Sequence, residues 1–174
     1  MRLFISINLD EETKKKILEV QDRLKSFGRG NFTKEDNLHL TLSFLGEVDV
    51  NDLPKVKRAM ERVSFPKLHL RFGKTGCFRR DSELWWIGID DNRALNTLQK
   101  KLTEELVKEG LKPDRKRFVP HITLSREMHT GLKEGLSFKP FTYEASSISL
   151  MLSSRENGRL TYTSLYEKKG AIND

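Results

Sequence analysis

The chain has 174 residues, of which 33% are charged and 36% hydrophobic, and its net charge at pH 7 is +7. This composition suits a globular domain with one core and excludes an integral membrane protein, which needs an apolar span of about 20 residues. The single cysteine, Cys77, excludes an internal disulfide and a cysteine-based zinc site. We therefore predict a soluble, cytoplasmic protein without a signal peptide, and the basic excess favours anionic partners.

Alternating apolar residues predict a first strand over Leu3–Leu9, and Asp10 after it is typical of a helix N-cap. The helix that follows has one apolar face and ends before two glycines. The face is formed by Ile17, Val20, Leu24 and Phe27, and the end is marked by Gly28 and Gly30. A second strand is expected over Leu38–Leu45.

A connecting helix and a further strand are predicted between residues 51 and 72. Asn51 or Asp52 can cap the helix, and Pro54 is tolerated in its first turn. The apolar face of the helix is formed by Leu53, Val56, Met60 and Val63. The strand is indicated by Leu68, Leu70 and Phe72.

The second half of the chain repeats the order of the first. A strand is predicted over Leu84–Ile89, a helix cap at Asp90 or Asp91, and another strand over Phe118–Ser125. The helix between them has an apolar face formed by Leu95, Leu98, Leu102 and Leu106, and it ends at Gly110. The chain closes with a predicted hairpin, indicated by Ile148–Leu152, Asn157–Gly158 and Leu160–Tyr166.

Strand, helix and strand thus occur twice at matched spacing, in residues 2–46 and 84–126. Such an internal repeat predicts two equivalent parts of one bilobal domain that spans residues 1–174. Strands exchanged between the lobes are compatible with this pattern.

The second strand of each unit carries the same pattern, His-x-Thr-Leu-Ser, at residues 39–43 and 121–125. Alternate side chains of a strand point to one face, so His39 and Thr41 share a face, as do His121 and Thr123. Each copy therefore offers one imidazole and one hydroxyl on a common surface. Two copies brought face to face would form a symmetric site.

Such a site can perform general acid–base chemistry without a metal or cofactor. Because imidazole has a pKa of about 6.5, one histidine can be neutral while the other is protonated near pH 7. The threonine hydroxyls can bind the oxygens of a phosphate in the transition state. In-line displacement at a phosphodiester fits this arrangement, and a ribose 2',3'-cyclic phosphate is an apt substrate.

Other roles for histidine are less consistent with this pattern. A lone strand histidine is usually structural, which is how we interpret His69 and His129. A metal site built from the two motif histidines and a carboxylate is disfavoured, because no carboxylate stands at a matched place in both motifs. A serine hydrolase is disfavoured, because the chain lacks a Gly-x-Ser-x-Gly motif.

These motifs and their flanks closely resemble the two-histidine (2H) phosphoesterases, and specifically the LigT-like RNA 2',3'-cyclic phosphodiesterases first named 2'-5' RNA ligases. The resemblance covers nearly the whole chain and is carried by residues 1–5, 37–46 and 118–126. It implies an α+β fold with two lobes related by a pseudo-twofold axis, each with an antiparallel sheet flanked by helices, around a central cleft. It also implies hydrolysis of an RNA 2',3'-cyclic phosphate to a 2'-phosphomonoester without a metal.

The resemblance further implies a role for each site residue. His39 would be the proton donor to the leaving 3'-oxygen, and His121 would be the proton acceptor that activates water. Thr41 and Thr123 would hold the phosphate, and Arg126 matches a common family residue that could supply charge. Strict alternation places Arg126 on the face opposite His121, so it reaches the site only if the strand ends or bulges there.

One departure from the family concerns the residue after the first motif, where lysine is frequent and this chain has Ser43. A positive charge near the phosphate site would then be missing.

The sequence is compatible with three functions. The leading one is hydrolysis of RNA 2',3'-cyclic ends or of related cyclic nucleotides, by a monomer that does not bind membranes. The second is the reverse chemistry, in which a cyclic end is joined to a 5'-hydroxyl through a 2'-5' bond. The third is a non-catalytic module that binds RNA ends, for which aromatic residues such as Phe78, Trp85 and Trp86 could stack a base.

Two basic runs lie outside the predicted helices, Arg79–Arg80 and Arg115–Arg117. They are better candidates for contacts with a phosphate backbone than the lysine runs of the helices, which we interpret as solvated faces.

Overall fold

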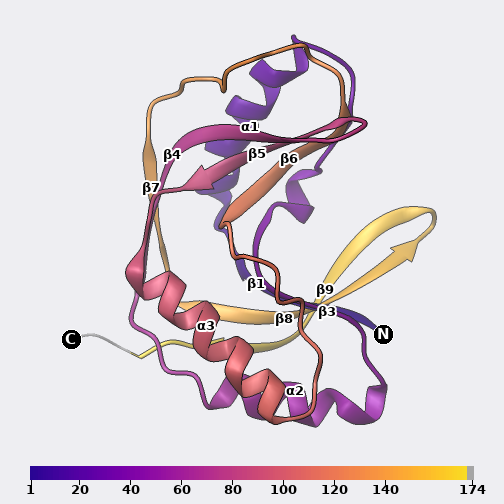
Figure 1. The fold of residues 1–174 in the computed structure, drawn as a ribbon, viewed down its shortest axis with the longest axis vertical. Helices are drawn as coiled ribbons and strands as arrows, with labels where there is room; N and C mark the ends of the chain where they lie inside the picture. Colours follow the sequence, from indigo (N-terminus) through magenta and orange to yellow (C-terminus); the bar gives the residue numbers. More distant parts are fainter. Residues whose placement is uncertain (172–174) are drawn as a thin grey trace.

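The computed structural model describes residues 1–171, so the last three residues of the predicted domain lie outside its described part. Two antiparallel sheets form two lobes (Figure 1). The first sheet has the strand order β3-β1-β8-β9, with β1 at Arg2–Asn8, β3 at His39–Glu47, β8 at Ser147–Glu156 and β9 at Arg159–Lys169. The second sheet has the order β2-β6-β5-β4-β7, with β2 at Asn31–Phe32, β4 at Leu68–Arg79, β5 at Glu83–Ile89, β6 at His121–Met128 and β7 at Phe141–Ala145. The predicted α+β fold with two lobes is confirmed.

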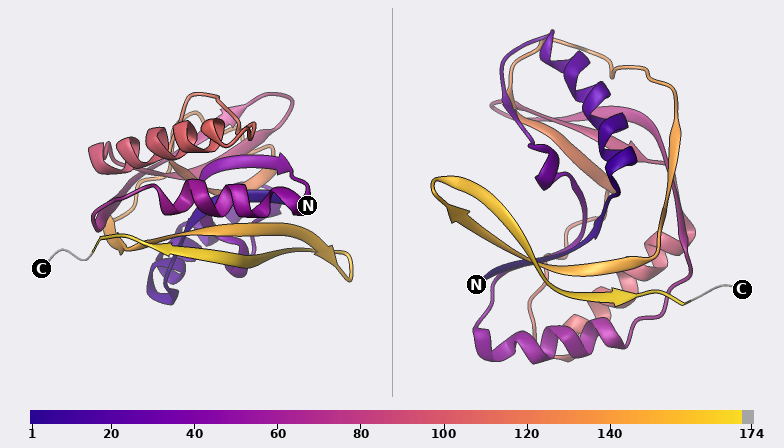
Figure 2. Two further views of the ribbon diagram at one scale, coloured as in Figure 1. Left: turned by 90° about the horizontal axis from the view of Figure 1, so that it is seen from below. Right: turned by 180° about the vertical axis from the view of Figure 1, so that it is seen from behind.

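The α-helices cover the outer faces of the two sheets, and two of them are exchanged between the lobes (Figures 1 and 2). The helices are α1 at Glu11–Lys25, α2 at Leu53–Glu61 and α3 at Arg93–Lys108, with short 3-10 turns η1 at Glu35–Asn37 and η2 at Val50–Asp52. Helix α1 follows β1 of the first sheet but lies beside the second sheet. Helix α3 follows β5 of the second sheet but packs on α2 and β3.

One glutamine in each exchanged helix donates a hydrogen bond to a motif strand. Gln21 Nε2 of α1 donates to the carbonyl oxygen of Leu124 at 2.9 Å. Gln99 Nε2 of α3 donates to the carbonyl oxygen of Leu42 at 3.4 Å. Both acceptors belong to the residue that directly follows the motif threonine.

Leu42 and Leu124 are β-bulge residues, each an extra residue in its ladder. Their neighbours pair with adjacent residues of the partner strand: Thr41 with Ser6, Ser43 with Ile5, Thr123 with Trp86 and Ser125 with Trp85. Up to each bulge the predicted alternation is confirmed, because Leu40 and Ile122 are fully buried while the motif histidines and threonines are half-buried.

The predicted helix boundaries were partly wrong. Helix α3 is capped by Asn92, whose Oδ1 accepts from the Leu95 amide at 2.9 Å, and neither Asp90 nor Asp91 caps it. The predicted cap position of α2 is confirmed, since Asp52 occupies it, but the Asp52 side chain makes no capping hydrogen bond. Phe27 lies beyond the end of α1 and is 43% exposed, so it does not belong to the apolar face.

The strands also differ from prediction at their ends. β6 begins at His121, since the preceding residues from Phe118 include Pro120 and form no ladder. β4 continues to Arg79, and the short strands β2 and β7 were not predicted. The C-terminal hairpin is confirmed, with positive φ angles of 52° at Asn157 and 76° at Gly158. Within residues 1–171, no helix is long and apolar enough to cross a membrane.

Glu83 connects the start of β5 to the loop after β6 through side-chain hydrogen bonds. It accepts hydrogen bonds from Trp85 Nε1 at 2.8 Å and from Thr130 Oγ1 at 2.6 Å, and it pairs with Arg79 at 3.1 Å. Burial would raise the pKa of the Glu83 carboxyl, but the hydrogen bonds from Thr130 and Trp85, together with the Arg79 charge, lower it to about 2.

We expect this depressed pKa to make stability depend on pH. The contribution is complete well above the ordinary glutamate pKa and is lost as the pH falls from about 4.5 towards 2. As the pH falls from 6 to 2, protonation of Glu83 should lower the unfolding free energy of the wild type by about 3 kcal/mol. Urea denaturation of Glu83→Gln should lack that part of the loss, and identical pH dependence in both proteins would contradict the assignment.

Ser43 and Ser125 provide a matched test of a buried hydroxyl. Ser125 Oγ donates to the Asn31 carbonyl at 3.3 Å, whereas the buried Ser43 Oγ has no hydrogen-bond partner within the described chain. We expect Ser43→Ala to raise the free energy of unfolding by about 1 kcal/mol and Ser125→Ala to lower it by about the same amount. Urea denaturation measures both, and equal destabilisation would refute the difference.

Candidate functional site

His39 is held by its backbone neighbourhood and by the side chain of Thr41. Its Nδ1 lies 2.7 Å from the Asn37 carbonyl oxygen, which can only accept, so Nδ1 carries a proton. Its Nε2 lies 2.8 Å from Thr41 Oγ1. The imidazole packs against two aromatic rings that also contact each other, with centroid distances of 4.8 Å to Phe4 and 5.1 Å to Tyr162. Its tautomer and orientation are therefore fixed.

His121 is held by the same type of hydrogen bond to a backbone carbonyl. Its Nδ1 lies 2.6 Å from the carbonyl oxygen of Val119, again two residues before the histidine, so Nδ1 donates and Nε2 is free to exchange a proton. Its aromatic neighbours differ from those of His39, since its ring meets Phe78 edge-on at 5.4 Å and lies 6.3 Å from Trp86.

Trp86 lies flat over two glycines on the His121 face of the second sheet. A Cβ atom at Gly76 would be 2.2 Å from the Trp86 ring, and one at Gly88 would be 2.8 Å from it. These glycines leave the space that the indole occupies. Trp85 points the other way and is 1% exposed, so of the two tryptophans Trp85 is the core residue.

The two motif strands approach each other although they belong to different sheets, since Cα atoms of β3 and β6 come within 8 Å. The positive charge that His121 can carry lowers the pKa of His39. The charge of Arg126 lowers the pKa of both histidines, and it partly offsets the rise that burial causes in the pKa of Tyr162. The structure therefore brings His39, His121 and Arg126 into one electrostatic site.

The largest influence on both imidazoles is burial, which lowers the pKa of His39 and of His121 by disfavouring the charged ring. The carbonyls of Asn37 and Val119 act in the opposite direction, because they accept from Nδ1. The charge of His121, when present, lowers the pKa of His39 further, so protonation of both rings at once is disfavoured.

The bulge at Leu124 explains how Arg126 belongs to this site. Strict alternation had placed Arg126 on the opposite face, but the extra residue reverses the facing of the side chains beyond it. After the equivalent bulge in β3, Phe44 occupies the position that corresponds to Arg126. The guanidinium of Arg2 lies 5.2 Å from the centre of the Phe44 ring. Ser43 is buried on the core side, so a lysine there would not face His39.

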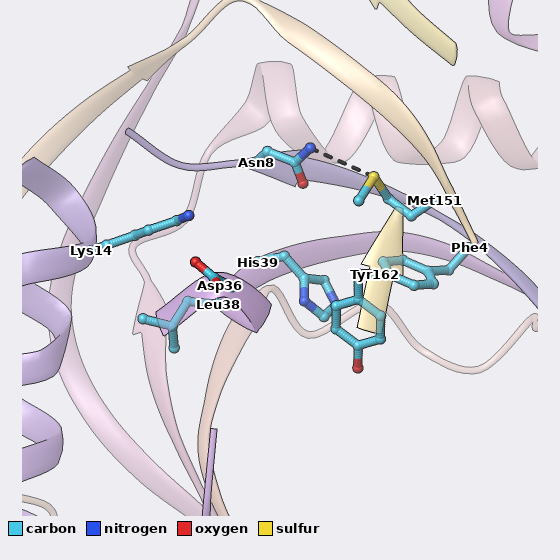
Figure 3. Close-up of a pocket in the computed structure, with 8 residues that line it drawn as sticks. All are labelled: Phe4, Asn8, Lys14, Asp36, Leu38, His39, Met151 and Tyr162. Atoms are coloured by element: carbon cyan, nitrogen blue, oxygen red, sulfur yellow. Dashed lines mark hydrogen bonds between the residues drawn. The ribbon is translucent and has the colours of Figure 1, made fainter. Parts of the chain in front are cut away.

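A pocket of about 130 Å³ opens against His39, and His121 does not line it (Figure 3). Its wall includes Asn8, whose Nδ2 donates to Met151 Sδ at 3.6 Å. Sequence reasoning missed this pocket wall, formed by Phe4, Asn8, Lys14, Asp36, Leu38, Met151 and Tyr162. The available signal was Asn8, the polar last residue of β1, which pairs directly with His39.

Metal-binding side chains do not gather at the histidines. Among the residues that the structure describes, no three His, Cys, Asp or Glu side chains lie close enough together to hold a metal ion. His69 and His129 do not belong to the site; His69 pairs with Glu144 at 3.0 Å on the edge strand β7.

Residues 11–151 match the model of the 2'-5' RNA ligase superfamily, which covers well over half of the chain. The chain belongs to this superfamily. It is 32% identical to the RNA 2',3'-cyclic phosphodiesterase of Thermotoga maritima over 96% of this chain and 94% of that protein. It is 30% identical to the RNA 2',3'-cyclic phosphodiesterase of Escherichia coli over 94% of this chain and 93% of the relative.

Solved structures of this superfamily share the fold. The crystal structure of E. coli LigT complexed with 3'-AMP matches with a TM-score of 0.84 at 30% sequence identity, covering 98% of each chain. The apo form of E. coli LigT matches with a TM-score of 0.86 at 28% identity, again over 98% of each chain. The resemblance inferred from the two motifs is therefore confirmed.

The electrostatic role of Arg126 can be measured directly. We expect NMR titration of the ring protons to give a pKa below 6.5 for both His39 and His121, because burial disfavours their charged forms. Arg126→Met should raise both pKa values, since it removes a nearby positive charge. The matched control is Arg155→Met, near the tip of the β8–β9 hairpin, which should leave both unchanged. Unaltered titration in Arg126→Met would exclude Arg126 from the site.

Proposed function

We propose that this protein hydrolyses the 2',3'-cyclic phosphodiester end of RNA to a 2'-phosphomonoester by general acid–base catalysis. The observation that carries the proposal is the pair of imidazoles on β3 and β6. Both have Nδ1 bound to a backbone carbonyl, so proton exchange with a substrate falls to Nε2, which on His39 also contacts Thr41 Oγ1. Arg126 adds a positive charge to the same site. This combination suits an anionic ester that needs one proton removed and one supplied.

In the proposed reaction, His121 Nε2 accepts a proton from water as the water oxygen attacks phosphorus. The bond between phosphorus and the ribose 3'-oxygen breaks, and His39 Nε2 donates its proton to that oxygen. The product keeps the phosphate on the 2'-oxygen, and the two histidines have exchanged their protonation states. The resemblance assigns donor and acceptor, because the carbonyl contacts of the two rings are equivalent.

Thr41, Thr123 and Arg126 are proposed to bind the non-bridging phosphate oxygens. Thr41 Oγ1 already lies 2.8 Å from His39 Nε2, so it is close to the atom that would face the leaving oxygen. The bound phosphate anion would raise the pKa of both histidines, opposing the effect of burial and favouring the protonated acid. The proposed mechanism uses no metal or cofactor, which stays a prediction.

The names of the relatives support cyclic phosphodiester hydrolysis as the activity. The ligation of RNA through a 2'-5' bond is the reverse chemistry at the same site and remains the second candidate, in keeping with the name of the superfamily. We further propose that residues 1–174 act as one bilobal domain, as a monomer and in the cytoplasm. The non-catalytic RNA-end-binding module is the least favoured candidate, because binding alone does not need two tautomer-fixed imidazoles.

The test uses a short RNA that ends in a 2',3'-cyclic phosphate, in the presence of EDTA. We expect the wild type to form the 2'-phosphate, and His39→Ala and His121→Ala each to lose activity by about 100-fold or more, since each removes a general acid or base. Product analysis by electrophoresis and phosphatase sensitivity distinguishes the 2'-phosphate from a longer, joined RNA.

His69→Ala is the matched control and should keep full activity, because His69 lies outside the site. Tight RNA binding without turnover by folded wild type would favour the binding module. Activity that survives either motif substitution would show that the catalytic residues are wrong, and activity abolished by EDTA would contradict a metal-free reaction.

A further inference from the structure

The segment that joins α3 to β6 carries the basic run Arg115, Lys116 and Arg117, which the reaction at the histidines does not use. Its first end is attached to the first motif strand, where the Asp114 amide donates to the carbonyl of Phe44 at 2.9 Å. Its other end leads directly into the second motif, where the Val119 carbonyl accepts from His121. The run therefore lies between the two catalytic strands.

The backbone of this run is ordered by local contacts. The Lys116 amide donates to Asp114 Oδ1 at 3.0 Å, and the neighbouring Pro113 is buried. The side chains of the three basic residues are exposed. A buried proline and a side-chain-capped turn thus hold three cations at the surface beside the site.

Within residues 1–171, no Asp or Glu oxygen lies within 4.0 Å of these three cations, which distinguishes them from most basic side chains of the helices. By contrast, ion pairs at the helices engage Lys14, Lys16, Lys25, Lys55, Arg58, Arg62, Lys101 and Lys108. The run is therefore available to an anionic ligand without first breaking an ion pair.

The other basic run is already engaged. Arg79 pairs with Glu83 at 3.1 Å and also donates to the carbonyl of Leu132. Its guanidinium thus has a structural role in the β4–β5 hairpin. Both Arg79 and Arg80 are exposed, but within residues 1–171 only Arg80 lacks an ion pair. Of the two runs singled out from the sequence, the one at residues 115–117 therefore carries the larger unpaired charge.

Arg2 extends the positive charge towards the histidines. It packs on Phe44, the residue whose carbonyl accepts from Asp114. Together with Arg126 it partly offsets the rise that burial causes in the pKa of Tyr162 beside His39. Arg2 thus adds a positive charge between the histidine site and the point where the basic segment is attached. A cyclic mononucleotide has a single phosphate, which would bind at the histidines. An RNA strand has further backbone phosphates that the basic run could bind.

We propose that Arg115, Lys116 and Arg117 bind the backbone phosphates of the RNA strand that precedes the cyclic end, so that the protein selects oligonucleotide ends over cyclic mononucleotides. This inference rests on the proposed function, because it assigns the substrate class of the same site. Arg and Lys that neutralise phosphates give affinity without base specificity, and each contact on a single strand contributes about 0.7 to the slope of log affinity against log salt.

The experiment compares a short RNA ending in a 2',3'-cyclic phosphate with 2',3'-cyclic AMP. For the variant in which Arg115, Lys116 and Arg117 are all changed to Ala, we expect KM for the RNA to rise by about tenfold or more. The salt dependence of KM should weaken by about 2 units of slope, from three lost contacts. The kcat/KM for 2',3'-cyclic AMP should stay within about twofold of the wild type, because this substrate does not reach the run.

Two further variants serve as controls. Changing Lys15, Arg93 and Lys100 to Ala removes the same net charge from exposed positions on α1 and α3, and it should leave both substrates unaffected. Arg115→Lys with Arg117→Lys keeps the charge and should retain the salt slope. Circular dichroism checks that each variant is folded.

The outcomes separate the two proposals. If the wild type hydrolyses neither substrate, the proposed function fails. If it hydrolyses both and the alanine variant shows unchanged KM and salt slope for RNA, the function stands and the basic run is excluded as an RNA site. An equal rise of KM for both substrates, or an equal effect of the control triple, would also overturn the proposal.

Discussion

The β-bulges at Leu42 and Leu124 are the constraint on which the site depends. A bulge removes one residue from the ladder and leaves its backbone polar groups in need of other partners. Here the carbonyls of both bulged leucines accept from a glutamine side chain, Gln99 for Leu42 and Gln21 for Leu124. Each glutamine comes from the helix of the other repeat unit, so each catalytic strand keeps its shape with support from the opposite half of the chain.

The bulges also decide what the site contains. Before each bulge, alternation puts histidine and threonine on the inner face, and after it the facing is reversed. This reversal places Arg126 with the histidines at one motif and Phe44 at the corresponding position of the other. Two nearly identical motifs therefore present one charged and one aromatic side chain, and the surroundings of the two imidazoles differ in the same way, with Tyr162 beside His39 and Trp86 beside His121. The result is a site with equivalent catalytic groups and unequal walls.

Much of this arrangement could be predicted from sequence because it follows from local periodicity. The facing of His39 and Thr41 required only a strand, and the hairpin at Asn157–Gly158 required only two residues that tolerate positive φ. The bulges could not be predicted, since a register shift depends on the partner strand and on the helix that binds the freed carbonyl. The exchange of α1 and α3 likewise depends on tertiary packing, because the apolar face of a helix does not determine which sheet the helix will cover.

Helix caps and short strands were missed for a different reason. Three consecutive polar residues, Asp90, Asp91 and Asn92, are all acceptable caps, and Asp90 instead pairs with Arg71 on the neighbouring strand. The edge strand β7 has an alternating burial pattern over only five residues, and β2 has only two residues. Whether segments this short form strands depends on the strands beside them.

The strand order of the first sheet has a consequence for biosynthesis. Its strand β1 is synthesised long before one of its two neighbours, β8, because Arg2–Asn8 and Ser147–Glu156 are far apart in sequence. Until β8 and β9 have been translated, one edge of β1 has no partner, and the Tyr162 wall of the His39 pocket does not exist. Such long sequence separation slows folding and leaves an open strand edge during synthesis. The N-terminal unit is therefore expected to need protection by a chaperone, or by the early packing of α1, while the rest of the chain is made.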